Sequence, residues 1–529
     1  MAVSILGNDA LKASQQWQPK RLTVQLGAAA LLVALADALF YGHRLGVSLA
    51  LYLAVLAAAA MCLNKVRATT STRWRAALLI LIGLLPVIED LNWLSAAIAL
   101  LATATSARMF TEARDLHWRE HLRAAAALPF SSMFRLFSDL SRASRFQNRR
   151  GQRIAILAGV LGWIVPLLFC AIFAALFFEA NPLLENWLRQ LDIGAALAQI
   201  VSIRTIFWAA MLLLIWPLLR IRSLHVRKRF AAPLAPIATN KLLASLNDRT
   251  VRRSLVLFNG LFALQTTMDI VFLWGGASLP DGMTHATYAH RGAYPLVVTA
   301  LLAAGFVLVA MRPSESSERD PWVRPLILVW VVQNIVLVLS ALLRLDLYVD
   351  AYSLTELRVA AFIWMLLVAV GLALILVQIC LRRGIEWLVS ANALVLALTL
   401  YAYSFVNTAA MIASFNFRHS FEMRGEGPPI DVRYLFSLGP SVIPALDYYA
   451  PRIAAAGHSG PQTGSTVGAR SGRMIEARRV ELARSHLEAQ VGWRSWSFRG
   501  WRLSQYLANT PDDPFKATPE SPTDLPEAK

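Results

Sequence analysis

One acidic residue lies inside an apolar segment, where a charge requires a partner. Asp269 follows Gln265 by four residues and Thr266 by three, and Asn259 lies seven residues before Thr266. These spacings place the four polar side chains on or near one face of a helix. Inserting a carboxylate into a bilayer is unfavourable by about 2.5–3.5 kcal/mol, so this face must point into a helix bundle. There Asp269 could bind a proton or a substrate, or could form a structural hydrogen bond to a neighbouring helix.

Other acidic residues lie near the ends of apolar segments. Glu89 and Asp90 separate two short apolar segments, and they either enter the outer leaflet or stay in a solvated turn. Asp37 lies alone in the outer half of the first apolar segment, where a structural ion pair is favoured over a functional role.

Histidine and arginine side chains precede the apolar segment that starts at Pro295. The loop reads HATYAHRGAYPLVV and contains His285, His290 and Arg291. Histidine titrates near neutral pH and binds metals. Two histidines at this spacing, with no cysteine nearby, form only a weak pattern for metal binding, so we expect no metal here. Arg291 close to Asp269 would offset the free energy needed to bury both charges.

The stretch DAYSLTELRVAAFIW opens a later helix. Ser353 lies three residues before Glu356, which is the spacing of a capping box. Arg358 directly precedes the apolar run and could reach the same outer region as Arg291.

One match to a zinc-peptidase pattern is rejected. HWREH, from His117 to His121, fits H-x-x-E-H. A zinc site of that kind needs a third ligand and an open coordination position on a sizeable domain, whereas this stretch is short and rich in arginine. Glycine-rich phosphate loops, a G-x-S-x-G elbow and HExxH are absent from the sequence. We therefore expect no cofactor and favour a non-enzymatic protein; a membrane-embedded transferase with His290 or Asp269 as general base is the weakest alternative.

These residues must be positioned by apolar helices. Hydrophobic residues make up 57% of the 529 residues and charged residues only 16%, whereas soluble domains carry about 25% charged residues. The apolar segments that predict membrane spans are 22–41, 47–63, 76–88, 94–107, 154–178, 205–219, 254–274, 295–311, 325–343, 359–381 and 387–408. The predicted fold class is all-α: a polytopic membrane bundle of about 11 transmembrane helices with an extracytoplasmic helical tail.

Two parts of this assignment leave alternatives open. Residues 22–41 read as a retained helix, with a cleaved signal peptide as the alternative. The segments 76–88 and 94–107 are shorter than a full crossing, so they either cross the bilayer or form a re-entrant hairpin around Pro86.

Basic residues are distributed unevenly between alternate connections. The amino-terminal segment 1–21 and every second connection together hold 31 Lys and Arg residues, and the remaining connections hold 6. Cytoplasmic loops carry such an excess. We expect a bacterial inner (cytoplasmic) membrane protein with a cytoplasmic amino terminus and an extracytoplasmic carboxyl terminus.

The same distribution bears on partners. The chain has a net charge of +18, and its basic cytoplasmic loops 108–153 and 220–253 are expected to contact the anionic inner leaflet. The first of these loops also contains an amphipathic pattern typical of a membrane-surface helix, with a partner-binding helix as the alternative. Because the charge lies on one side of the spans, membrane lipid is the expected partner and nucleic acid is not.

The composition changes at the end of the transmembrane domain, which is predicted at 22–416. An extracytoplasmic tail is predicted at 417–507 and a disordered, proline-rich carboxyl terminus at 508–529. Within the tail, residues 457–473 read as a Gly/Ser-rich linker. The tail ends in GWRSWSFRGWRLSQYL, whose interleaved tryptophans and arginines favour packing onto the outer membrane–water boundary over ligand binding. A protein partner could also bind at the tail.

Four segments of the chain carry a family resemblance: LPVIEDLN, YAHRGAYPLVVTALLAAGFVLVA, YSLTELRVAAFIWM and DVRYLFSLGPSVIPALDYY. Through them the chain resembles an uncharacterised, domain-of-unknown-function family of bacterial multi-pass inner-membrane proteins, over most of residues 40–450. The resemblance implies a multi-pass membrane protein and supplies no mechanism. It marks as candidate positions Glu89, His290, Arg291, Tyr294, Tyr352, Thr355, Glu356, Arg358, Asp431 and Tyr434.

The candidate polar groups share the outer ends of the spans. We expect an outward-facing polar cavity with Asp269 as the buried acid, Arg291 and Arg358 as counter-charges and His290 as the titrating group. The substrate-binding candidates are Asp269, His290, Arg291, Glu89, Glu356 and Arg358. Such a cavity favours transport, or the handling of lipids or small molecules. The alternative is a non-enzymatic membrane sensor or an assembly or scaffold protein.

Overall fold

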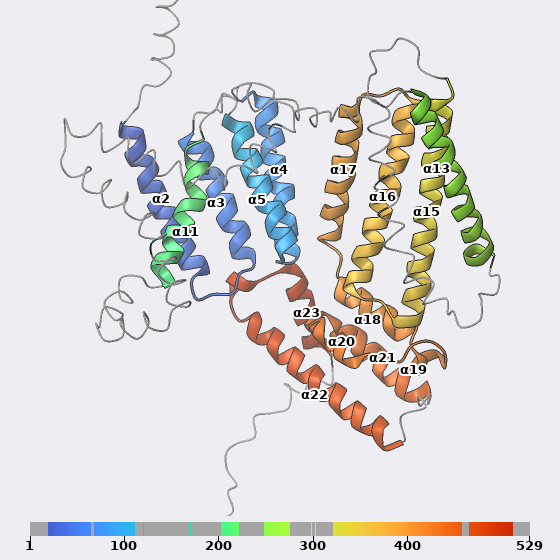
Figure 1. Cartoon of the computed structure of the whole chain (residues 1–529). Coiled ribbons are helices and arrows are strands. Elements are labelled where there is room, and N and C mark those ends of the chain that lie inside the picture. The colour runs from blue at the N-terminus through green and yellow to red at the C-terminus, as the bar shows by residue number, and fades with distance from the viewer. Residues whose placement is uncertain are drawn as a thin grey trace, which may run out of the picture. The chain divides into compact units, whose positions relative to one another are not determined.

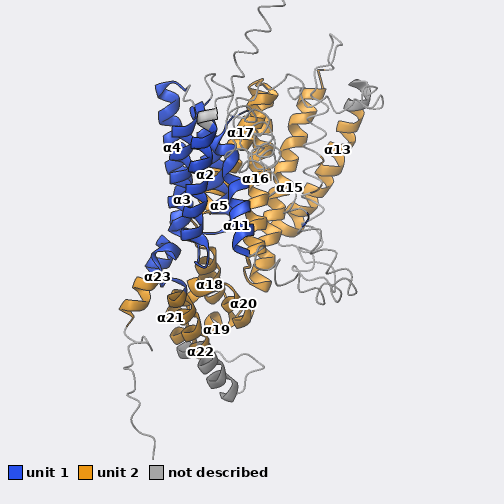
Figure 2. Cartoon of the chain, turned by 90° about the vertical axis from the view of Figure 1, so that its left-hand side faces the viewer, with its two compact units in different colours: residues 1–225, 489–502 blue, residues 226–488, 503–529 orange. Residues whose placement is uncertain are grey.

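A computed structural model describes residues 19–64, 68–111, 203–221, 248–275, 321–456 and 465–510, with the single residues Glu120, Cys170, Val298 and Leu302. Within these ranges every regular element is a helix and no strand is present, which confirms the all-α prediction. The chain divides into two compact units (Figure 2). The first comprises residues 1–225 and 489–502, and the second comprises residues 226–488 and 503–529.

Seven of the described helices are long and apolar enough to cross a membrane. They are α2 (Pro19–Phe40), α4 (Thr70–Glu89), α5 (Trp93–Thr111), α13 (Asp248–Met268) with its continuation η1 (Asp269–Trp274), α15 (Val323–Tyr352), α16 (Glu356–Cys380) and α17 (Ile385–Tyr403). Two shorter apolar helices, α3 (Val47–Leu63) and α11 (Ile203–Leu219), match two more predicted spans. The predicted spans 154–178 and 295–311 lie outside the described residues apart from three single positions, so the number eleven stays a prediction.

Helices α4 and α5 are longer than the predicted spans 76–88 and 94–107, which are by themselves too short to cross a membrane. They contain 20 and 19 residues, and at about 1.5 Å per residue each can cross the hydrocarbon core by itself. Pro86 lies inside α4 and does not end it. The two helices pack closely through small residues, since a Cβ on Gly83 would lie only 2.2 Å from the Cβ of Ala102.

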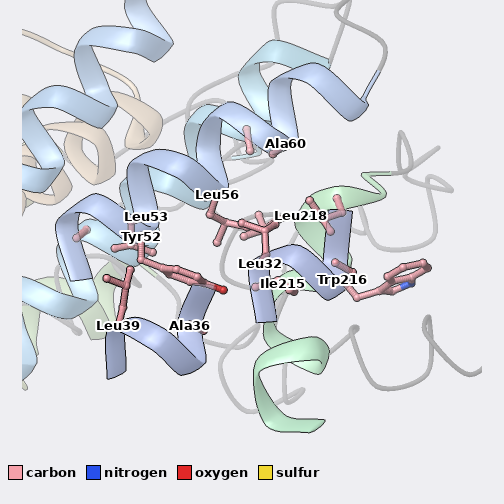
Figure 3. Packing of buried hydrophobic residues seen from close by; sticks show 14 of the residues in the cluster. Leu32, Ala36, Leu39, Tyr52, Leu53, Leu56, Ala60, Ile215, Trp216 and Leu218 are labelled. Atoms are coloured by element: carbon pink, nitrogen blue, oxygen red, sulfur yellow. The ribbon is translucent and has the colours of Figure 1, made fainter. Parts of the chain in front are cut away.

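The first unit is built from α2, α3, α4, α5 and α11 around one apolar core (Figure 1). Figure 3 shows part of this core, in which Leu32 and Leu39 of α2, Leu53 and Leu56 of α3 and Ile215 of α11 are buried. The side chains that α2 and α3 turn away from the core include exposed leucines and valines, as expected for helices that face lipid.

Polar side chains tie α11 to its neighbours at one end of this unit. The amide of Asn64 donates to the carbonyl of Leu218 at 2.9 Å and accepts from the backbone N–H of Ile221 at 2.9 Å. Gln25 of α2 donates to the carbonyl of Leu219 at 3.1 Å. These bonds satisfy carbonyls at the carboxyl end of α11 that have no partner within the helix.

The membrane helices of the second unit form a row in the order α17, α16, α15 and α13 (Figure 1). Their shared core includes Leu255 and Phe262 of α13, Trp330 and Val338 of α15 and Leu372 of α16. Helix α15 has 30 residues and extends through residue 352, well beyond the predicted span 325–343.

The predicted boundary between residues 416 and 417 falls inside a helix, so from here on the tail means residues 404–510, whose described parts form helices with a core of their own. They are α18 (Thr408–Arg418), α19 (Phe421–Arg424), α20 (Val432–Ser437), η2 (Pro440–Val442), α21 (Ile443–Ala456), α22 (Ser465–Ala489), η3 (Trp493–Ser495) and α23 (Phe498–Asn509). Buried apolar residues of α18, α20, α21, α22 and α23 pack together in the second unit. The predicted linker 457–473 is wrong in its second half, because α22 begins at Ser465.

A polar network inside the tail joins three of these helices. Arg479 of α22 donates to both carboxylate oxygens of Asp447 of α21, at 2.5 and 2.8 Å. The hydroxyl of Tyr506 of α23 donates to the same carboxylate at 3.1 Å. A bidentate pair with a third donor is a specific way to hold α21, α22 and α23 in register.

Candidate functional site

Asp269 lies where α13 changes to the π-helical segment η1. The backbone N–H of Gly275 donates to the carbonyl of Ile270 at 2.8 Å, which is the five-residue spacing of a π-helix. Asp269 is the first residue of this segment and is fully buried, with 0% of its surface exposed. Such π-helical turns within α-helices are frequent at functional sites, because they re-aim side chains and loosen the backbone ladder.

The counter-charge of Asp269 is Arg344 of α15. The guanidinium Nη2 of Arg344 donates to Asp269 Oδ1, and the amide of Gln265 donates to the same oxygen at 2.9 Å. Only 4% of the Arg344 side chain is exposed. In the absence of a partner, each charge would be strongly unfavourable in a low-dielectric bundle, so the pair accounts for how both are accommodated.

Sequence reasoning missed Arg344. The predicted span ended at residue 343, which placed Arg344 in a loop, and the candidate counter-charges were Arg291 and Arg358. The sequence nevertheless contained a sign that Arg344 belongs to the helix. Arg344 lies four residues after Ser340 and eleven after Gln333, and this spacing places the three polar residues on one helix face. This face is the one that α15 turns towards α13.

A line of polar contacts follows the interface between α13 and α15. The amide of Asn259 donates to the carbonyl of Leu326 at 3.1 Å, and Gln333 donates to the carbonyl of Asn259 at 3.3 Å. Near the other end, the indole N–H of Trp274 donates to the hydroxyl of Ser340 at 3.2 Å. Asn259 contacts a residue at the start of α15, and Trp274, which is later in the chain, contacts a residue later in α15, so α13 and α15 run in the same direction.

Several buried oxygens on this interface have no hydrogen-bond partner among the described residues. Because buried polar atoms are paired in the great majority of cases, such a concentration points to groups that a proton, water or a ligand can satisfy. The atoms are Asn259 Oδ1, Thr266 Oγ1, Asp269 Oδ2, Gln333 Oε1 and Asn334 Oδ1. Asp269 thus presents one satisfied oxygen and one that is open to a further donor.

Glu89 lies in the first unit and pairs with the tail. Its carboxylate accepts from Arg502 Nη2 at 2.6 Å and from Arg499 Nε at 3.4 Å, and Asp90 accepts from Arg499 Nη1 at 3.0 Å. Burial raises the pKa of the Asp90 carboxyl, and the charge of Arg499 opposes that shift. The tail segment therefore neutralises the acidic turn between α4 and α5.

Asp37 has a structural partner, which agrees with the favoured interpretation. Arg204 of α11 donates to both of its carboxylate oxygens, at 2.9 and 2.5 Å, and Trp208 donates to Oδ1 at 2.8 Å. Half of the Arg204 side chain is exposed, in contrast to the buried Arg344.

Glu356 and Arg358 lie at the start of α16, in the second unit. The N-cap of this helix is Thr355, whose hydroxyl accepts from the Arg358 N–H at 3.4 Å, so the predicted cap Ser353 is wrong by two residues. The Arg358 guanidinium donates to the carbonyls of Tyr352, at 2.6 Å, and Ser353, and therefore caps the carboxyl end of α15. Arg358 does not pair with Asp269.

The same turn is held by the tail. The Asn416 side chain accepts from the backbone N–H of Leu354 at 2.7 Å and donates to its carbonyl at 2.9 Å. The Tyr434 hydroxyl accepts from the backbone N–H of Glu356 at 2.9 Å, and burial raises the pKa of Tyr434. The backbone of Glu356 therefore contacts the tail.

The remaining candidates lie outside the described residues. His290, Arg291 and Tyr294 fall in this group, as do His117 and His121 of the rejected zinc pattern. Within the described ranges no group of three or more His, Cys, Asp or Glu side chains could hold a metal ion.

The described helices define an all-helical membrane protein in which a buried ion pair joins two apolar helices. A family model described as a domain of unknown function, DUF4153, matches residues 76–449. The match covers more than half of the chain, which therefore belongs to the DUF4153 family, and the predicted resemblance is confirmed. No curated protein and no solved structure matches the chain significantly.

Proposed function

We propose that the polar interface between α13 and α15 binds a polar or anionic small molecule or lipid headgroup, and that the protein transports or handles this molecule in the membrane. The observation that carries the proposal is the fully buried pair of Asp269 and Arg344 at the start of a π-helical segment. Ionisable residues inside membrane helices mark substrate, ion or proton pathways by default.

The chemistry of the pair suits such a role. Asp269 Oδ1 accepts from Gln265 and Arg344, and Oδ2 has no donor among the described residues. An anionic ligand that took the place of this carboxylate would be held by the same guanidinium donors of Arg344. His290 and Arg291 could add to the site from the loop before the predicted span 295–311.

We place the protein in the bacterial inner membrane, with the amino terminus in the cytoplasm and the carboxyl terminus outside. Contacts of the tail support this topology. In the first unit the tail contacts the predicted outer turns at Val47 and Glu89, and in the second unit Asn416 contacts the predicted outer turn at Leu354. The basic loops 108–153 and 220–253 would then face the anionic inner leaflet.

The test is native mass spectrometry of the purified full chain. Wild type is compared with Asp269→Asn and with the control Asp37→Asn, which alters an ion pair away from the α13–α15 interface. We expect a stoichiometric small molecule or lipid that wild type and Asp37→Asn retain and Asp269→Asn loses. A bound mass that is absent from all three proteins, or is equal in all three, would count against the proposal.

A second function is favoured by the tail. Within the second unit its helices have their own apolar core and contact the turn at Leu354, and within the first unit residues 489–502 contact the turn at Glu89. A sensor or assembly factor with an extracytoplasmic domain would require such contacts. Loss of cellular function on deletion of 420–529, together with a harmless Asp269→Asn, would favour this alternative.

A further inference from the structure

Residues 489–502 lie against the ends of apolar helices in the first unit. The backbone N–H of Val47, the first residue of α3, donates to the carbonyl of Trp496 at 2.8 Å. Arg499 pairs with Glu89, the last residue of α4. Where spans begin and end, the bilayer passes from hydrocarbon to headgroups. This segment is therefore held at the level of the membrane–water interface.

Large apolar side chains of this segment are exposed in spite of their attachment to the unit. The exposed fraction is 85% for Val491, 55% for Trp493, 39% for Phe498 and 42% for Trp501. Trp93, the first residue of α5, is 81% exposed at the same turn that Arg499 contacts. Tryptophan and other aromatic residues are enriched where a membrane meets water, since one part of the ring is apolar and the N–H can be hydrated.

Helix α23 carries an exposed aromatic pair beside the arginines that contact α4. Phe498 and Trp501 stack with ring centroids 5.6 Å apart. Arg499 and Arg502 turn to the acidic residues at the end of α4, and Leu507 is buried on another side of the helix. The exposed aromatic pair borders Arg502, whose guanidinium lies 4.8 Å from the Phe498 ring centroid, and it lies on the side of the helix opposite Leu507.

Two of the three arginines of the segment pair with carboxylates of the protein. Glu89 and Asp90 pair with Arg499 and Arg502, and the Arg494 guanidinium lies 5.2 Å from the Trp493 ring centroid. A surface that bound lipid by charge would present unpaired arginines, whereas Arg499 is mostly buried and the half-exposed Arg502 is paired with Glu89. The exposed surface here is apolar and aromatic, which fits insertion between lipid headgroups better than attraction to an anionic surface.

We propose that Val491, Trp493, Phe498 and Trp501 form a lipid-binding surface that inserts into the interfacial layer of the outer leaflet. The partner is the phospholipid interface itself, zwitterionic lipids included. The ion pairs of Arg499 and Arg502 hold the segment at the correct depth, and Trp93 extends the surface onto α5.

Site-directed spin labelling tests this inference in the full chain. The three native cysteines, Cys62, Cys170 and Cys380, are first replaced by alanine. Single cysteines are then placed at Trp501 and at Val491, with Arg478→Cys on the exposed, charged face of α22 as the control. Labelled proteins are reconstituted in phosphatidylcholine nanodiscs, and collision rates with oxygen and with a water-soluble nickel complex are compared.

We expect labels at 501 and 491 to collide more often with oxygen than with nickel, and the label at 478 to show the reverse. Raising the salt concentration to about 1 M should leave the collision rates at 501 and 491 unchanged, because the contact between these side chains and lipid is apolar. Labels as accessible to nickel as the control would overturn the proposal. Labels shielded from both reagents would also overturn it, because protein would then cover the surface. Labels that become accessible to nickel at high salt would overturn it as well, because the contact with lipid would then depend on charge. Because Val491 is 85% exposed, Val491→Cys tests the surface even if the Trp501 variant does not fold.

Discussion

The guanidinium of Arg344 donates to Asp269 at the residue where α13 becomes π-helical, and both side chains are buried. The pair joins two neighbouring apolar helices that run in the same direction. Its position explains how a carboxylate is accommodated inside an apolar segment. It also leaves Asp269 Oδ2 open to a further donor.

Removing one member of this pair should destabilise the protein more than removing both. Asp269→Leu or Arg344→Leu alone leaves an uncompensated buried charge, and we expect each to lower the free energy of unfolding by about 3–5 kcal/mol. The double variant Asp269→Leu/Arg344→Leu should recover most of that loss, since no charge stays buried. The unfolding temperature of each of the three variants is measured in detergent, with the loss of monodisperse protein on heating as the readout.

The pair of Asp37 and Arg204 is the matched control. Because half of the Arg204 side chain is exposed, water can solvate a charge left behind by Asp37→Asn or Arg204→Gln. We expect smaller shifts in unfolding temperature here than at Asp269. Equal shifts at the two pairs would contradict the burial argument.

The prediction of the fold from sequence succeeded where it rested on long apolar periodicity, and it failed at helix ends. The row of apolar helices follows from composition, but Arg344 was assigned to a loop because its helix continues past the apolar run with charged residues. Asp269 was identified correctly as a buried acid from the spacing of Gln265 and Thr266. Its partner was not, because spacing along one helix does not reveal which helices are neighbours.

The contacts of the tail were beyond sequence reasoning for a similar reason. Arg499 and Arg502 pair with Glu89, more than four hundred residues away in sequence. Nothing in the spacing of either segment specifies such a pair. Asp37 could have been matched with Arg204, since both lie at predicted outer ends of spans.

The close packing of α4 and α5 should not tolerate a larger residue at Gly83. The added methyl of Gly83→Ala would overlap the Cβ of Ala102, and we expect a loss of about 1–3 kcal/mol of stability. The second-site change Ala102→Gly should restore it by making room for the new methyl. Gly27→Ala is the control, because a Cβ there would meet no atom within 4 Å, and its unfolding temperature should not fall below that of wild type. If Gly83→Ala unfolds at the same temperature as wild type, the two helices can move apart without a measurable loss of stability.

Gly46 should be required for attachment of the tail in the first unit. A Cβ at this position would lie 2.4 Å from the backbone carbon of Ser495, and backbone atoms cannot move aside as a flexible side chain can. We expect Gly46→Ala to increase the rate of proteolytic cleavage near residue 493 by about tenfold, which corresponds to about 1.4 kcal/mol of lost attachment. Gly492→Ala, whose Cβ would have no neighbour closer than 4.0 Å, should leave the rate unchanged. Equal rates for the two variants would contradict the observed contact.

The two acids at the end of α4 should respond differently to neutralisation. Burial raises the pKa of Asp90 above its usual value of 3.8, so the folded protein holds that proton more tightly than the unfolded chain does. The contribution of Asp90 to stability is therefore fully present below the unfolded pKa and is lost as the pH rises through the folded pKa.

We accordingly expect Asp90→Asn to keep the tail attached at neutral pH and to flatten the pH dependence of unfolding above the usual carboxyl pKa of 3.8. Glu89→Gln should instead loosen the tail at neutral pH, because Glu89 accepts from both Arg499 and Arg502. Proteolysis of the tail and thermal unfolding across this pH range measure both effects. A larger loss of attachment in Asp90→Asn than in Glu89→Gln would be inconsistent with the two roles.

The most direct measurement of the central claim is native mass spectrometry of the stable, charge-free variant Asp269→Leu/Arg344→Leu beside wild type. If the pair binds a small molecule or headgroup, the double variant will fold and yet lose the mass that wild type carries. If the double variant retains the same bound mass as wild type, the pair is a structural contact and the proposed binding site is wrong.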